Sequence, residues 1–184
     1  MPSGMPHLIV AKKIDPNADI DFYIGNLAPD ANREREKKDK VHFAGVPDME
    51  SALKEFALKA DNNYLKGFLL HLYVDWKWNT TILPDFISKI DGRWYPAYHE
   101  ENCKIVSYAF YNTEWAYDLY EQLENWDCAG FVETEFITKE NIKERILSAK
   151  KWLSENKLEP SEAFPPELIE KFANDTADSF IKWF

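Results

Sequence analysis

Hydrophobic residues recur every three to four positions along most of the chain, a spacing typical of amphipathic helices. Between residues 63 and 79, for example, Leu65, Phe68 and Leu72 would share one face of a single helix. Ser3 and Pro6 are expected to open the first helix. Helices are predicted over residues 6–13, 20–27, 47–57, 63–79, 84–90, 100–124, 138–156 and 165–184.

Two segments lack this spacing. Residues 32–40 are a run of mostly charged side chains with no apolar stripe, which predicts a solvated loop. Residues 131–137 alternate briefly between apolar and polar, so we expect an extended loop there, with a lone strand as the alternative. The rest is helical. The sequence therefore predicts an all-α fold, a single domain over residues 1–184 made of about seven to eight helices.

The composition supports one well-packed core. The 184 residues are 45% hydrophobic and 29% charged, and a chain of this length forms one core more readily than two. Only six glycines are present, which argues against a turn-rich β-sandwich or barrel. The net charge of −10 repels polyphosphate, so no nucleic-acid partner is expected. An anionic substrate would need a local positive charge.

The sequence lacks the usual signals of secreted and membrane proteins. Cys103 and Cys128 are too few for a disulfide framework. The first residues show no basic segment followed by an apolar run, so no signal peptide is predicted. The longest apolar stretch, residues 67–74, is too short to cross a bilayer. We therefore expect a soluble cytoplasmic protein without a membrane span, and the oligomeric state is left open.

His71 and Asp75 lie four residues apart within the most apolar predicted helix. This spacing places both side chains on one helix face, where they could share a metal ion or where the carboxylate could satisfy a core histidine. Asp30 follows an apolar helix, and His42 returns the chain to the core. Because a buried unpartnered imidazole is costly, a metal would satisfy all four residues together. Two histidines and two carboxylates suit zinc, iron or manganese better than calcium.

Four motifs follow one another in the first part of the chain. They are His7, Gly-Asn-Leu-Ala-Pro-Asp30, Asp-Lys-Val-His42-Phe and Gly-Phe-Leu-Leu-His71-Leu-Tyr-Val-Asp75-Trp. Over roughly residues 1–80, their order resembles the zinc-dependent phospholipase C and single-strand nuclease superfamily, in particular its short intracellular bacterial phospholipase C-like hydrolases. The resemblance implies an all-α bundle around up to three metal ions. It implies a first ion bound by Asp30, His42 and His71. It also implies that Asp75 bridges this ion to a second one, which His7 binds.

The chain departs from this family at the third metal site. There the resemblance implies two further histidines and a glutamate, with a His-x-x-x-Glu spacing. In this chain the remaining histidine is His99, and position 103 is Cys103. We expect the third site to be absent or rebuilt, with His99 as an additional candidate ligand. The expected cofactors are one to two divalent transition metals, zinc first, with iron, manganese or nickel as alternatives.

These residues predict a metal-dependent hydrolase for a small phosphate ester, of the phosphodiesterase or phospholipase C type. The metal would lower the pKa of a bound water toward about 7, and the resulting hydroxide would attack phosphorus. Asp30 and Asp75 are the predicted catalytic residues, Asp75 as the bridge and Asp30 as a proton acceptor. A histidine–aspartate-type phosphohydrolase is disfavoured because no histidine is directly followed by aspartate. A helical interaction module with a structural or inactive metal site stays open.

Two further clusters could contact a substrate. An aromatic cluster lies beside the predicted metal helix, at Trp76, Trp78, Trp94, Tyr95 and Tyr98. Core packing is its expected role, with a pocket wall as the alternative. A basic cluster lies between two predicted ligands, at Arg33, Arg35, Lys37, Lys38 and Lys40. It is expected to be a solvated face, with contact to an anionic substrate as the alternative.

Overall fold

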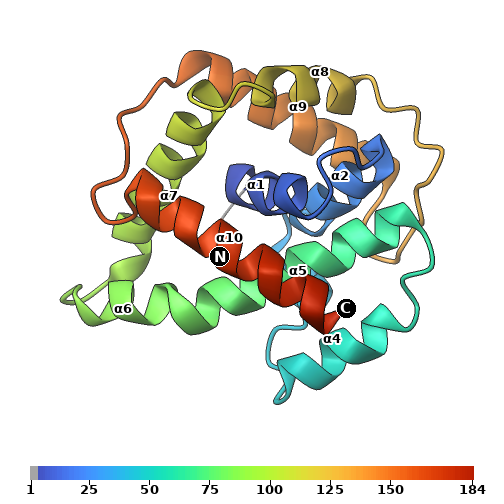
Figure 1. Cartoon of the computed structure of the whole chain (residues 1–184), viewed down its shortest axis with the longest axis horizontal. Coiled ribbons are helices and arrows are strands. Elements are labelled where there is room, and N and C mark those ends of the chain that lie inside the picture. Colours follow the sequence, from blue (N-terminus) through green and yellow to red (C-terminus); the bar gives the residue numbers. More distant parts are fainter. Residues whose placement is uncertain (1–3) are drawn as a thin grey trace.

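The computed structural model describes residues 4–184, which form ten α-helices and one short 3₁₀ helix (Figure 1). They are α1 (Met5–Ile14), α2 (Ile20–Leu27), η1 (Ala28–Asp30), α3 (Arg35–Val41), α4 (Met49–Ala57), α5 (Asn63–Thr81), α6 (Leu83–Ser88), α7 (Trp94–Tyr111), α8 (Ala116–Glu124), α9 (Lys139–Glu155) and α10 (Pro166–Trp183). No strand forms in these residues; Thr134 and Ile137 make one isolated bridge in an extended loop. The predicted all-α fold is confirmed. Ser3 lies outside the described residues.

The helices predicted to begin at residues 63, 138 and 165 begin there or one residue later, as α5, α9 and α10. The Thr138 side chain accepts from the backbone N–H of Asn141, and the Asn141 side chain accepts from that of Thr138, which is a capping box. Asn62 caps α5 by accepting from the N–H of Leu65, and Pro166 is the first residue of α10. These contacts involve only sequence neighbours, so sequence reasoning finds them.

Two predicted segments are wrong in detail. The expected loop over residues 32–40 contains α3, whose charged side chains pair along its exposed surface, Arg35 with Asp39 and Lys40 with Glu36. These pairs help a helix form without an apolar stripe. The predicted helix over 100–124 is two helices, α7 and α8, with α7 ending where the Asn112 side chain donates to the Tyr108 carbonyl.

The helix α5 packs closely against α2, and glycine makes this approach possible. A Cβ added at Gly67 would lie 1.9 Å from the carbonyl oxygen of Phe22, and one added at Gly25 would lie 1.9 Å from that of Tyr64. Any larger residue would push the two backbones apart. The contact places the end of α2, and the η1 turn that follows it, beside the middle of α5.

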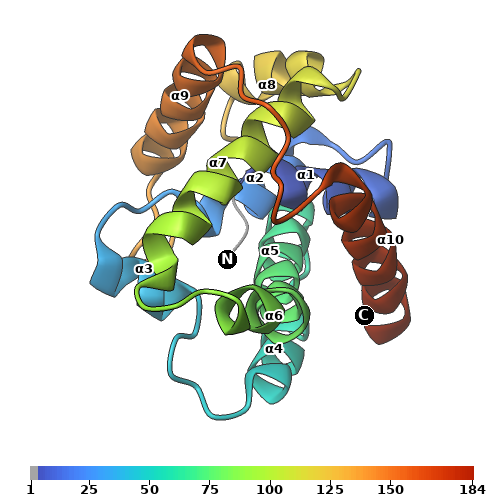
Figure 2. The same cartoon turned by 90° about the vertical axis from the view of Figure 1, so that its left-hand side faces the viewer.

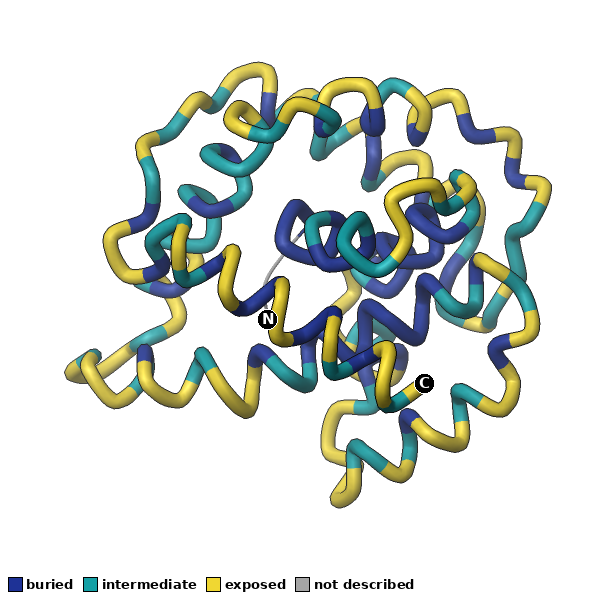
Figure 3. Tube along the Cα trace, in the orientation of Figure 1, coloured by how far each residue is buried: buried dark blue, intermediate teal, exposed yellow. Residues whose placement is uncertain are grey.

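The helix α1 lies inside the arrangement, against α2, α5, α7 and α10 (Figures 1 and 2). Its residues Met5, Leu8 and Val10 are fully buried, and α1 is largely dark blue in Figure 3. The polar side chain of His7 is also fully buried in this helix. A polar ring inside an apolar helix needs partners there, and the neighbouring α5 supplies them.

None of the helices in residues 4–184 combines the length and the apolar character that a membrane crossing requires. The longest, α5, has 19 residues and carries two lysines, a histidine and an aspartate. Its buried residues pack against other helices of the chain.

Candidate metal centre

The five residues of the four sequence motifs converge at one place in the core. His7 comes from α1, Asp30 from η1, His42 from the C-terminal end of α3, and His71 and Asp75 from α5. Their potential ligand atoms form two groups of three, and within each group the atoms lie within 4.8 Å of one another. One group is His7, His71 and Asp75, and the other is Asp30, His42 and His71. Each group could hold a metal ion.

Backbone carbonyls fix the proton on two of the histidine rings. His71 Nδ1 donates to the carbonyl of Asn26 and His42 Nδ1 to that of Lys38, each at 2.8 Å. Because a carbonyl oxygen only accepts, the Nε2 atom of each neutral ring carries a lone pair. The two Nε2 atoms lie 3.1 Å apart. Two lone pairs at this distance repel each other unless a cation, either a proton or a metal ion, lies between them.

The Asp75 carboxylate lies between the two groups. Its Oδ2 atom is 3.4 Å from Nε2 of both His42 and His71, and its Oδ1 atom is 3.4 Å from Nε2 of His7. Both oxygens are buried and accept no hydrogen bond from the described residues. A buried carboxylate without hydrogen-bond donors is costly, and a bound cation is one way to satisfy it.

Asp30 is shared between the histidines and a lysine. Its Oδ1 atom is 3.5 Å from His42 Nε2, 3.9 Å from His71 Nε2 and 2.6 Å from Lys38 Nζ. Lys38 belongs to α3, the segment predicted as a solvated loop, and the sequence did not predict its contact with Asp30. Its position four residues before His42, one helical turn away, is the signal that could have indicated it.

Burial and mutual charge set the protonation of the group. For Asp30 burial is the largest influence and raises the pKa, but the His42 hydrogen bond and the charges of His71 and Lys38 bring it well below its ordinary value. The pKa of Asp75 is also low, because His71 and His7 outweigh its burial. Burial, with repulsion from His7, lowers the pKa of His71 to about 4. At neutral pH the carboxylates are therefore charged and His71 is neutral, as metal ligation requires.

The His42 ring responds in the opposite direction. Burial, the largest influence, lowers its pKa, but the hydrogen bond with Asp30 and the charges of Asp75 and Asp30 raise it above its ordinary value. His42 thus attracts a positive charge more strongly than His71 does. A metal ion supplies that charge without a proton.

His99 belongs to neither group of three. It lies on α7, with its Nδ1 atom 3.3 Å from the Sγ atom of Cys103, one turn along the helix. Burial and the charge of Glu100 raise the pKa of the Cys103 thiol, so the thiolate is disfavoured. This pair occupies the two positions at which we tested the sequence for a His-x-x-x-Glu spacing, with Cys103 in place of the glutamate.

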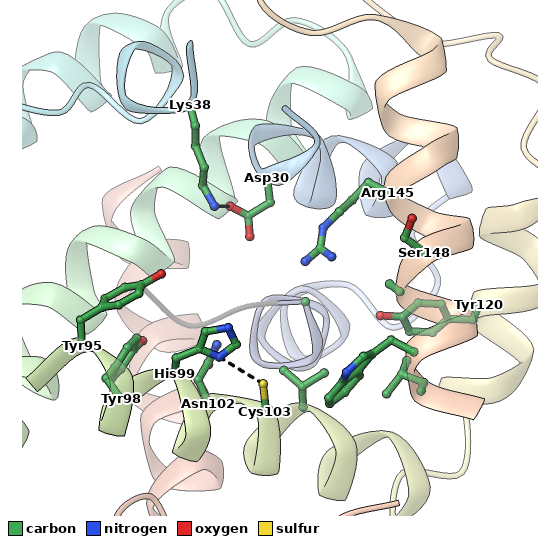
Figure 4. Close-up of a pocket in the computed structure, with 15 residues that line it drawn as sticks. Asp30, Lys38, Tyr95, Tyr98, His99, Asn102, Cys103, Tyr120, Arg145 and Ser148 are labelled. Carbon is green, nitrogen blue, oxygen red and sulfur yellow. Dashed lines mark hydrogen bonds and ion pairs between the residues drawn. The ribbon is translucent and has the colours of Figure 1, made fainter. Parts of the chain in front are cut away.

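A cavity of about 490 Å³ adjoins the centre on the side of Asp30 and Lys38 (Figure 4). Tyr95 and Tyr98 of the aromatic cluster line it, on the same helix as His99. Trp78 instead lies fully buried against Phe164 and Phe172 of the core. Within the aromatic cluster, Tyr95 and Tyr98 therefore form part of a pocket wall, whereas Trp78 packs in the core.

No protein-family model, curated protein or solved structure matches this chain. A functional assignment consequently depends on the chemistry of the five converging residues and the cavity beside them.

Proposed function

We propose that this chain is a metal-dependent hydrolase of phosphate esters. The observation that carries the proposal is the facing pair of Nε2 atoms of His42 and His71, each held as an acceptor by a backbone carbonyl. When both rings are neutral, these two atoms and the buried Asp75 carboxylate beside them are three acceptors without a hydrogen-bond donor between them. Nitrogen and carboxylate donors in this combination suit zinc, with iron, manganese and nickel as alternatives.

The donor atoms divide between two ions in the way a bridging carboxylate allows. His71 belongs to both groups of three, but its single Nε2 atom can bind only one ion. Because this atom lies 3.1 Å from Nε2 of His42, we assign it to the first ion, together with His42 and Asp30. Asp75 directs Oδ2 toward this group and Oδ1 toward His7. His7 would then hold a second ion with Asp75, so the site takes one to two ions.

When bound, a divalent ion supplies charge that polarises a phosphoryl oxygen and lowers the pKa of a water molecule to about 7. The protein residues provide the position. Asp30 faces both the centre and the cavity, so an ester in the cavity reaches the centre past this carboxylate. Lys38 and the backbone of α3 hold Asp30 and His42 in place.

The order of the four motifs also supports the phosphate-ester class, since it resembles that of the phospholipase C and single-strand nuclease superfamily. The all-α fold agrees with this resemblance. The acidic chain gives a further reason for a metal, because an anionic ester needs a local positive charge that a net charge of −10 does not provide.

Metal analysis combined with turnover tests the proposal. The chain is purified without an affinity tag, its metal content is measured by mass spectrometry, and hydrolysis of a chromogenic phosphodiester and monoester is followed with added zinc or manganese. We expect one to two ions per chain and metal-dependent turnover. Bound metal without turnover of any ester would favour a structural site in an interaction module. Absence of bound metal would overturn the proposal.

A further inference from the structure

The cavity beside the metal centre is formed by two facing helical stripes (Figure 4). The stripe on α7 has the spacing of one helix face and comprises Tyr95, Tyr98, His99, Asn102, Cys103 and Val106. The stripe on α9 has the same property and comprises Arg145, Ser148, Ala149 and Trp152. Asp30 and Lys38 line the cavity from the side of the centre. One compartment therefore joins the metal ligand Asp30 to residues far along the sequence.

Arg145 has no charge partner in this compartment. Its half-buried side chain points into the cavity in Figure 4, and no ion pair or hydrogen bond links its guanidinium to residues 4–184. The next cation on the same helix, Lys150, pairs with both Glu121 and Glu124. In a chain of net charge −10, an unpaired guanidinium facing a cavity is unusual, because carboxylates outnumber cations.

The other charges of the cavity cancel. Asp30 is the one carboxylate among its described lining residues, and Lys38 neutralises it at 2.6 Å. The charge of Arg145 is close enough to the buried Tyr120 hydroxyl to lower its pKa, although burial is the larger influence and raises that pKa to about 12. Among the described lining residues, Arg145 is thus the positive charge that no carboxylate compensates.

A guanidinium offers five N–H donors in a planar fork that matches the oxygens of a phosphoryl group. Half-buried, it gains more from such a partner than an exposed lysine would, because less water competes. Arg33 is exposed and is not among the described lining residues, but its Nη2 atom donates to Ser148 Oγ at 2.8 Å. Ser148 itself lines the cavity one turn from Arg145.

Four further residues of the described lining are aromatic. Tyr95, Tyr98, Tyr120 and Trp152 surround the space between the two stripes. Aromatic faces bind flat apolar groups and contribute little to the binding of a bare inorganic anion. The lining therefore distinguishes a phosphate ester with an aromatic organic part from free phosphate.

We propose that Arg145 binds the phosphoryl group of the substrate against the metal centre, and that the substrate is a phosphate ester whose organic part is aromatic. This inference rests on the proposed hydrolase function for the identity of the reacting group. Arg145 is a specificity-determining residue in this arrangement. It lies on α9, outside the segment whose motifs indicated the metal ligands.

The test is the binding of phenylphosphonate, an ester analogue that hydrolases do not cleave, measured by calorimetry on the chain as purified. Metal content is measured on the same samples. We expect Arg145→Gln to weaken binding at least about tenfold, as the loss of a charge-assisted contact predicts. Arg145→Lys should recover part of the affinity. Arg93→Gln is the matched control, because Arg93 is exposed and lies outside the cavity, and it should bind like the wild type.

Three results would overturn the inference. They are binding by Arg145→Gln within about twofold of the wild type, no binding of phenylphosphonate by the wild type, and equal affinity for phenylphosphonate and inorganic phosphate. The result of this binding experiment can be distinguished from the result of the test for hydrolase function. A chain without metal or turnover refutes the hydrolase, whereas the Arg145 effect on phenylphosphonate binding is measured in either case.

Discussion

Lys38 contacts Asp30 through the same carboxylate oxygen that faces the histidines, with Nζ 2.6 Å from Oδ1. The backbone carbonyl of Lys38 also accepts the proton of His42 Nδ1. One residue of α3 therefore orients two of the five converging side chains, through its side chain and its backbone separately. The charge run of this segment is partly a solvated face and partly a support for the centre.

Replacing Lys38 with methionine should weaken metal binding about tenfold. Partners that orient metal ligands typically contribute 10- to 100-fold to affinity. The lower end is expected because the loss of the Lys38 ammonium also removes a charge that repels the metal. Competition with a chelator of known affinity measures the effect. Lys37→Met is the control, because Lys37 lies on the same helix, is half-buried like Lys38 and pairs with Glu34 instead of Asp30. Unchanged affinity in Lys38→Met would show that Asp30 holds its position without this lysine.

His71→Ala should lose most of the bound metal. His71 is common to both groups of three, so its removal opens both coordination spheres. His99→Ala removes a histidine that belongs to neither group and should keep its metal. Mass spectrometry of the purified variants gives the stoichiometry. Full occupancy in His71→Ala would refute the site.

Asp75→Asn should cost more activity than His7→Ala, with a loss of at least about 10²-fold, comparable to that of one electrostatic transition-state contact. The amide keeps the shape of the side chain but removes the charge that offsets two dications. His7 contributes to one ion only. Hydrolysis of a chromogenic phosphodiester at saturating zinc or manganese compares the two variants. Near-wild-type turnover in Asp75→Asn together with an inactive His7→Ala would mean that Asp75 is not the bridge.

Gly67→Ala should destabilise the fold by about 2 kcal/mol or more, since overpacking usually costs 1–3 kcal/mol and the clash here is with backbone. The added Cβ would lie 1.9 Å from the Phe22 carbonyl, so α2 and α5 must separate. Denaturant unfolding measures the change, and Thr81→Ala at the exposed end of α5 is the control. The same shift would disturb the bond from His71 to Asn26, so metal should also be lost. Stability equal to the wild type would contradict this account of the helix contact.

The sequence predicted those parts of the fold that depend on close neighbours. The predicted helices over 138–156 and 165–184 are confirmed as α9, which begins after the capping box of Thr138, and α10, which begins with a proline at its first position. Hydrophobic spacing did not predict α3, because charge pairs such as Arg35 with Asp39 support it. It also merged α7 with α8, since the apolar stripe continues past the side-chain contact of Asn112 that ends α7.

The sequence also indicated some residues of the site and not others. Spacing alone related only His71 to Asp75, which share a face of α5. The placement of Asp30 and His42 beside apolar segments added these two residues, and the order of the motifs added His7. The structure brings all five together. The contact of Lys38 with Asp30 and the position of Arg145 in the cavity depend on how α3 and α9 pack. The spacing of Lys38 and His42 is a weak signal for the first, and no pattern within α9 indicates the second.

The buried position of α1 has a consequence for synthesis of the protein. This helix packs against α10, which leaves the ribosome long after α1 does. During that interval the apolar surface of α1, with Met5, Leu8 and Val10, has no complete covering and is open to chaperones or aggregation. His7 is part of this helix, so it joins the other residues of the centre only when α1 packs in its final position. Capture of a metal by the nascent chain would therefore begin at α5 and end with α1.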